Sequence, residues 1–164
     1  MNIPADSITV RQVTPGDVRR INELIRMLAE HQRAADQAVA TADDLHAALF
    51  ASHPSLFGHV ADCGGYVVGF TLWFLSYSTW VGKHGIHLED ICVMPEMRGR
   101  GVGRALLAEL ASICVQRGYG RLDWSVLRGN ESAIGFCQSV GAEAMPKWNA
   151  YRLSGRSLAD LAGK

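Results

Sequence analysis

The chain has 164 residues, and its 16 basic and 16 acidic side chains cancel to a formal net charge of zero at pH 7. This length suits one domain with a sizeable core, and an apolar content of 48% argues against a disordered or fibrous protein. The neutral balance argues against nucleic acid or an anionic membrane as the main partner. Because there is no N-terminal signal pattern and no apolar run of the ~18 residues a membrane span needs, we expect a cytoplasmic protein.

Hydrophobic periodicity and end signals predict an alternating order of strands and helices. The expected elements are a strand over 8–13, a helix opened by Thr14, a helix opened by Thr41, a hairpin over 57–61 and 66–77, a strand over 86–94, a helix over about 102–116 closed by Gly118, a strand over 122–127, a helix over 131–140 opened by Asn130, and a strand over 145–153. No repeat, linker or low-complexity tract interrupts this order. The sequence therefore predicts a single α/β domain.

Cysteines and histidines give no metal or disulfide signature. The cysteines are far apart in sequence and form no Cys-x-x-Cys pair, so Cys63, Cys92 and Cys114 are expected as reduced thiols. His84 and His87 are three apart on a predicted strand and would point to opposite faces, so we expect no metal site there.

A basic, glycine-rich run stands between the strand over 86–94 and the following helix. It consists of Arg98, Gly99, Arg100, Gly101, Val102, Gly103 and Arg104. Glycines at every second position let the backbone approach a ligand closely, and a helix N-terminus with arginines favours a polyphosphate. A Walker A loop is excluded because no Gly-Lys-Ser/Thr follows, and the glycine spacing differs from a Rossmann fingerprint. The remaining alternative is an ordinary glycine-rich turn.

The run resembles the pyrophosphate loop of the GNAT N-acetyltransferases, whose pattern is roughly Arg/Gln-x-x-Gly-x-Gly/Ala. Arg98, Gly101 and Gly103 occupy its three marked positions. The order of elements is also similar to the GNAT fold, an α/β (α+β) fold with a mixed central sheet of about seven strands, splayed in the middle and flanked by about four helices. The resemblance spans about residues 8–154 of one domain over 1–164. It implies acetyl-CoA as co-substrate.

A second motif is similar to the spermidine/spermine N-acetyltransferase branch of that family. Tyr77, Trp80 and Gly82 form a Tyr-x-x-Trp-x-Gly run ahead of the strand sequence Leu-Glu-Asp at 88–90. The run at 130–134, the Gly-Ala pair at 141–142 and the late Trp148 also match. This resemblance implies a small-molecule primary amine as substrate and a homodimer as the assembly.

The resemblance implies roles for particular residues. Ile91, Cys92 and Val93 would pair by backbone with the pantetheine arm, residues 98–104 would hold the pyrophosphate, and Asn130 would hydrogen-bond the cofactor. A backbone N–H near Cys92 or Val93 would stabilise the oxyanion.

Glu89 would remove the proton of the amine, because burial raises the pKa of a carboxylate towards the working range. The alternative is a strand carboxylate paired with an arginine. Asp90 has opposite strand parity and is expected to face the other side of the sheet in a structural role.

Substrate contacts are implied for His31, Gln32, Trp80, Glu89 and Trp124. An aromatic face suits an amine cation, although core packing explains Trp124 equally well.

The chain departs from the family at Cys137, where a tyrosine normally serves as the acid for the departing thiolate. Three roles stay open for Cys137: an acid acting through water, a passive space-filler, or a nucleophile. Gln32 and the run at 146–149 also lack the acids that hold a long polyamine, which favours a diamine or a lysine- or thialysine-like amine. The leading hypothesis is direct acetyl transfer in a ternary complex. The alternative is a catalytically impaired module that binds acetyl-CoA or CoA without turnover.

Overall fold

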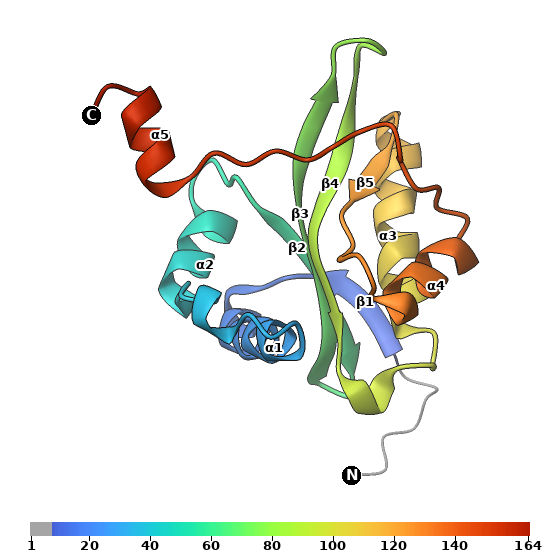
Figure 1. Ribbon diagram of the computed structural model, residues 1–164. Helices are drawn as coiled ribbons and strands as arrows, with labels where there is room; N and C mark the ends of the chain where they lie inside the picture. Colours follow the sequence, from blue (N-terminus) through green and yellow to red (C-terminus); the bar gives the residue numbers. More distant parts are fainter. Residues whose placement is uncertain (1–7) are drawn as a thin grey trace. The chain divides into compact units, whose positions relative to one another are not determined.

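The structure, a computed structural model, describes residues 8–164 (Figure 1). Residues 1–7 lie outside the described part, and with them the place of any N-terminal signal. The chain divides into two compact units, 1–125 and 126–164, which are taken in turn below. The expectation of one domain over 1–164 stays a prediction.

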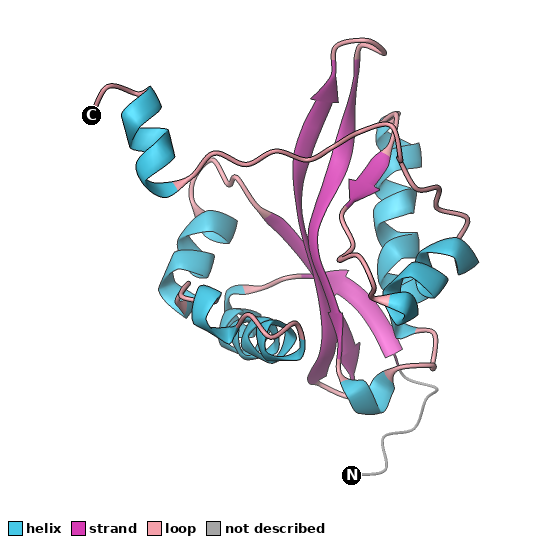
Figure 2. Cartoon of the chain, viewed as in Figure 1, coloured by secondary structure: helices cyan, strands magenta, loops and turns pink. Residues whose placement is uncertain are grey.

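The first unit is built on a mixed sheet of five strands in the order β1-β2-β3-β4-β5 (Figure 2). The strands are β1 Ile8–Gln12, β2 Phe57–Cys63, β3 Tyr66–Ser78, β4 Lys83–Val93 and β5 Leu122–Trp124. The first four are antiparallel neighbours, and β5 runs parallel to β4. The predicted α/β class with a mixed sheet is confirmed, with five strands in place of about seven.

Helices cover both faces of this sheet (Figure 1). On one face α1 (Val18–His31) and α2 (Ala42–Phe50) enclose a core that includes Phe70, Leu72 and Cys92. On the other face α3 (Val102–Arg117) packs through Val102 and Leu106 against Ala61 and Val68. Three short 3-10 helices, η2 Pro15–Asp17, η3 Ala35–Gln37 and η4 Pro95–Met97, lie in the connections. Cys63, Cys92 and Cys114 are buried.

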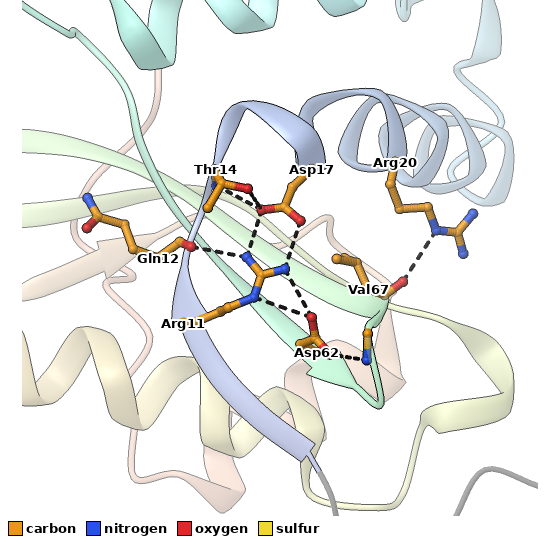
Figure 3. Close-up of polar contacts among 8 residues, drawn as sticks. Arg11, Gln12, Thr14, Asp17, Arg20, Asp62 and Val67 are labelled. Atoms are coloured by element: carbon orange, nitrogen blue, oxygen red, sulfur yellow. Dashed lines mark hydrogen bonds and ion pairs between the residues drawn. The ribbon is translucent and has the colours of Figure 1, made fainter.

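A carboxylate–arginine network fixes β1 to the start of the first helix and to the β2–β3 turn (Figure 3). Arg11 donates to both carboxylate oxygens of Asp17, at 2.7 and 2.9 Å, and to Oδ2 of Asp62 at 3.0 Å. Asp17 also accepts from the backbone N–H of Thr14 at 2.8 Å, which forms a capping box at the helix start predicted at Thr14. The Arg11 guanidinium and these further donors lower the pKa of Asp17 to about 2.

The second unit contains α4 (Glu131–Ser139) and α5 (Gly155–Leu161). Asn130 caps α4 as predicted, because its side chain accepts from the N–H of Ala133 at 3.1 Å. The strand predicted over 145–153 is wrong: within the described residues no strand pairs with this segment. Met145, Trp148 and Tyr151 are exposed, and Pro146 lacks the N–H that a ladder would use.

No helix among residues 8–164 is both long enough and apolar enough to cross a membrane.

Candidate active site

A β-bulge interrupts β4 at the two adjacent carboxylates. In the β3–β4 ladder Leu72 is opposite Asp90 while the next residue, Trp73, is opposite Leu88. Glu89 is therefore an extra residue on β4 without a partner position on β3. The bulge also breaks the strict alternation of side chains, so neighbouring positions in the sequence need not put Glu89 and Asp90 on opposite faces of the sheet.

The pairing of β3 with β4 shows on which face of the sheet Asp90 lies. Directly opposed residues share a face, and Asp90 is opposite Leu72, which belongs to the core beneath α1 and α2. Cys92, two residues further along β4, belongs to the same core. Asp90 therefore faces the α1/α2 layer.

The adjacent acids Glu89 and Asp90 differ in how far they are buried. Glu89 is exposed, whereas Asp90 is partly buried. Burial first, and the negative charge of Glu89 second, raise the pKa of Asp90 to about 6. The burial expected for Glu89 thus occurs at its neighbour.

The sheet opens at the same point of β4. β5 pairs with β4 only through Ile86, His87 and Leu88. Beyond Leu88, β4 has β3 as its one neighbouring strand among the described residues. The segment from Ile91 to Val93, expected to meet a pantetheine chain, lies along this unpaired edge, with Cys92 buried and its two neighbours partly buried.

Two contacts align α1 with β4. Arg20 Nη2 lies 3.2 Å from Sδ of Met94, and the Cys92 thiol lies 3.8 Å from the carbonyl oxygen of Leu24. The two contacts hold the N-terminal half of α1 against the C-terminal end of β4 and the residue that follows it. Leu28, one helical turn further along α1, packs against the same core as Cys92.

His31 is the last residue of α1, Gln32 is its C-cap, and both side chains are exposed. Their role as substrate contacts stays a prediction.

The glycine-rich run forms a tight turn into α3. Gly99 and Gly101 have φ of +73° and +82°, a region that side chains disfavour, and Gly101 is the N-cap of α3. A Cβ added at Gly101 would meet nothing within 4 Å, so the space in front of this backbone is open. The buried Val102 anchors the first turn, whose N–H donors have no acceptor within the helix.

Arginines surround this turn. Arg98 donates from Nε to the carbonyl oxygen of Val93 at 3.2 Å, which ties the loop to the open edge of β4. Arg100 and Arg104 are exposed on either side of Gly101. The arrangement combines a helix N-terminus, backbone donors and positive charge, the chemistry of a polyphosphate site.

The remaining predicted residues lie on other elements. Trp80 is at the tip of the β3–β4 hairpin and is 89% exposed, and Trp124 is a partly buried residue of β5 aligned with Leu88. Asn130 and Cys137 belong to the second unit, where Asn130 caps α4 and Cys137 is partly buried on that helix. Their roles stay predictions, as does that of Gly103, the second residue of α3. No group of three His, Cys, Asp or Glu side chains within residues 8–164 could hold a metal ion.

Sequence reasoning missed two features of the site. The first is the position of Asp90 beneath α1, because a bulge leaves no mark in the hydrophobic pattern. The second is the ring of His87 stacked on Phe74 with centroids 4.8 Å apart, on the strand just before the carboxylates. A pair of adjacent acids in an apolar strand was the one available signal.

Comparison with known proteins gives consistent results. The model of the acetyltransferase (GNAT) family matches residues 21–142. A thialysine N-epsilon-acetyltransferase from Bos taurus is 34% identical, with 96% of this chain and 98% of that protein covered. An L-ornithine N5-acetyltransferase from Arabidopsis thaliana is 28% identical, covering 91% of this chain and 85% of that protein. Among solved structures, an integron cassette protein from the mobile metagenome of V. cholerae has a TM-score of 0.80 at 26% identity, covering 96% and 99% of the two chains.

Proposed function

The chain belongs to the GNAT acetyltransferase family, and we propose that it moves an acetyl group from acetyl-CoA to a terminal primary amine of a small molecule. The observation that carries this proposal is the opening of the sheet beside β4, directly ahead of the glycine turn into α3. An open strand edge offers N–H and C=O groups to the amides of a pantetheine chain. The helix N-terminus offers donors to a pyrophosphate.

The cofactor would be held by the backbone of Ile91, Cys92 and Val93 and by residues 98–104, with Asn130 as a further contact. This would fix the thioester carbonyl beside the carboxylates of β4, so that proximity supplies much of the rate. A backbone N–H of the open edge near Cys92 or Val93 would stabilise the oxyanion. One of the carboxylates Glu89 and Asp90 would receive the proton of the ammonium group.

The substrate class follows from the charges near the site and from the relatives' names. The bovine and plant relatives are named for acetylating thialysine and L-ornithine, which both carry a terminal amine on an amino-acid side chain. Here Gln32 would stand at the amine site in place of an acid, next to His31, which disfavours a long polycation. Trp80 and Trp124 would supply aromatic faces for the ammonium group. We infer a lysine-, thialysine- or ornithine-like amine, with a short diamine as the next candidate.

A CoA-release assay over a panel of thialysine, lysine, ornithine, putrescine and spermidine tests this function. Saturable turnover with an amino-acid amine is the expected result. Tight CoA binding by calorimetry together with no turnover for any amine would favour the impaired module instead.

Assembly and location belong to the same proposal. A homodimer is expected from the resemblance to the spermidine/spermine N-acetyltransferase branch, and the cytoplasm is the expected location. Sedimentation velocity at micromolar concentration should give a dimer, and a clean monomer would contradict it.

A further inference from the structure

The side chains at the end of the β4–β5 ladder form a polar surface on one face of the sheet. His87 is opposite Phe74 on β3 and level with Asp123 on β5, and directly opposed residues share a face. Phe74 is two residues beyond Leu72 on β3, so this is the face that α1 and α2 cover at Leu72. Leu72 is buried whereas Phe74 and His87 are partly exposed, so the face becomes accessible here.

An arginine–aspartate ion pair lies on this surface. Nε of Arg121 is 2.7 Å from Oδ2 of Asp123, and each side chain is nearly half exposed. Residues two apart in an extended segment point to the same face, so both belong to the face of His87. A guanidinium has five N–H donors and a carboxylate has two acceptor oxygens, so this contact leaves both groups with capacity for a ligand.

Arg121 is held firmly by the sheet. Its carbonyl oxygen accepts from the N–H of Ile86 at 3.0 Å and from the thiol of Cys114 at 3.7 Å. The Arg121 stem lies against Gly85, where an added Cβ would come within 2.8 Å of Arg121 Cγ and 3.0 Å of Ser76 Oγ. That serine hydroxyl is buried and has no hydrogen-bond partner within the described part of the chain. The ion pair is thus positioned beside a polar atom that still lacks a partner.

The surface lies on the side of the sheet that the cofactor would leave free. The glycine turn leads into α3, which packs on the opposite face. In the proposed function the thioester enters the opening of the sheet from that side, so the face of Asp123 is left for the amine. The opening begins after Leu88, one residue past the pair of His87 with Asp123.

The length of an amino-acid side chain matches this spacing. Two strand residues rise about 6.6 Å, which takes the chain from the level of Asp123 to the first unpaired residue of β4. An extended side chain of three or four methylenes spans roughly 5–6 Å from Cα to its terminal nitrogen. A lysine- or ornithine-like molecule could therefore hold its terminal amine at the opening and its α-carbon beside the ion pair.

We propose that Arg121 and Asp123 bind the amino-acid head group of the substrate, with Arg121 on its α-carboxylate and Asp123 on its α-ammonium group. The proposal rests on the amine acetylation proposed above and names what selects an amino acid over a diamine. Each charge of the zwitterion meets a side chain of opposite sign, and a guanidinium binds a carboxylate through paired N–H donors. The Ser76 hydroxyl would supply a further donor. A diamine lacks the carboxylate and brings a second cation beside Arg121.

The test compares lysine with lysinamide and cadaverine, two analogues without the α-carboxylate, or ornithine with ornithinamide and putrescine if the amine panel favours ornithine. For wild type, kcat/KM should be about 10–100-fold higher for the amino acid than for either analogue, the range of one hydrogen-bonded charge contact. Arg121→Gln should raise KM for the amino acid by the same factor and leave kcat and KM for the diamine nearly unchanged. The variant thereby removes the preference.

The α-ammonium contact has its own measurement. Asp123→Asn should raise KM for lysine and lysinamide alike, while turnover of Nα-acetyl-lysine, which lacks the α-ammonium charge, should hardly respond. Arg156→Gln is the matched control, because Arg156 is an exposed arginine that pairs with Asp160 on α5, and it should follow wild type. A purely structural ion pair would change thermal unfolding in both site variants and leave the preference among the analogues as it is in wild type.

Several outcomes would overturn the assignment. Equal kcat/KM of wild type for the amino acid, its amide and the diamine would do so without any variant, even if Arg121→Gln failed to fold. A preference that persists in folded Arg121→Gln would mean that another residue binds the carboxylate, and an unaltered KM for lysine in Asp123→Asn would exclude the ammonium contact. A wild-type protein that binds acetyl-CoA and turns over no amine refutes the proposed function, and the assignment falls with it. Turnover without a head-group preference refutes the assignment alone.

Discussion

The indole Nε1 of Trp73 donates a hydrogen bond of 3.3 Å to Nδ1 of His59, across the adjacent strands β2 and β3. Both residues are buried, at 3% and 8% exposure, and their rings lie nearly parallel. Phe57 stacks on the same indole with centroids 4.7 Å apart. Because Nδ1 accepts, this arrangement requires a neutral imidazole with its proton on Nε2.

The first prediction follows from that neutral histidine. Burial lowers the pKa of His59 below 6.5, and the charge of Glu109 opposes this only in part. The unfolded chain then binds more protons below pH 6.5, so His59 makes the free energy of unfolding fall as pH decreases through that range. His59→Gln keeps an acceptor for Trp73 without titrating. Urea unfolding between pH 8 and 5 should show that the free energy of unfolding falls less for His59→Gln than for wild type.

Asp90 has the opposite effect on the free energy of unfolding in this pH range, because its pKa is raised in the folded protein. Its contribution is the same in wild type and in His59→Gln, so the difference between the two proteins reports on His59. The exposed His53→Gln serves as control and should follow wild type. Equal slopes for wild type and His59→Gln would mean that His59 takes up its proton in the folded protein as readily as in the unfolded chain.

The second prediction concerns acid stability and the Arg11 network. The pKa of Asp17 is about 2 in the folded protein, against 3.8 for an ordinary carboxyl. Ionised Asp17 therefore stabilises the fold above about pH 4, and this stabilisation is lost as pH falls towards 2. Its size is at most about 2 kcal/mol. Asp17→Asn should therefore lower the unfolding free energy at pH 7 by about 1–2 kcal/mol and flatten its dependence on pH between 4 and 2. Chemical unfolding across pH 2–7 measures this, with the exposed Asp36→Asn as control.

The third prediction concerns the glycine turn. Gly101→Val introduces a side chain at φ +82° and into the open space in front of the α3 N-terminus. The variant should lose some 1–2 kcal/mol of stability through backbone strain, and acetyl-CoA affinity should fall by at least tenfold. Gly64→Val, at φ +62° in the β2–β3 turn with equally open space, is the matched control. Calorimetry on both folded proteins separates strain from obstruction, and unchanged binding to Gly101→Val would mean that the phosphates lie elsewhere.

The fourth prediction concerns Cys137. As a space-filling residue it should be replaceable, so Cys137→Ala is expected to turn over within about tenfold of wild type. A hundredfold loss in a well-folded protein would identify the thiol as an acid, and Cys137→Tyr should then raise kcat. An acetyl adduct on the wild type in intact-protein mass spectrometry, absent from Cys137→Ala, would identify a nucleophile instead.

Local signals predicted most of the first unit. The long helix was expected over about 102–116 and occupies Val102–Arg117, because Gly118 closes it in the left-handed conformation at φ +67°. The β2–β3 hairpin turns at Gly64 and Gly65 as predicted, with Asp62 accepting from the N–H of Gly65 at 2.7 Å. Each of these features depends on residues adjacent in sequence.

The features that sequence reasoning missed depend on partners far away in the chain. The bulge at Glu89 exists only as a mismatch of register between β3 and β4, which neither strand encodes alone. The segment over 145–153 has strand-like composition, but a strand also needs a neighbour for its backbone groups. α5 was not predicted, and its few residues give a short apolar pattern with exposed Leu158 and Leu161.

β4 has a neighbouring strand on both sides over only part of its length, and this affects how the substrate preference of the protein can evolve. From Ile86 to Leu88 the strand is held on both sides, and beyond that point one edge remains available to a ligand. Main-chain N–H and C=O groups are the same for every residue except proline, so recognition along that edge tolerates drift at Ile91 and Val93 provided their side chains still pack. For the proposed amine acetylation, selection for a different amine would therefore fall on side chains outside this edge. A new substrate preference could arise there while the acyl donor stayed the same.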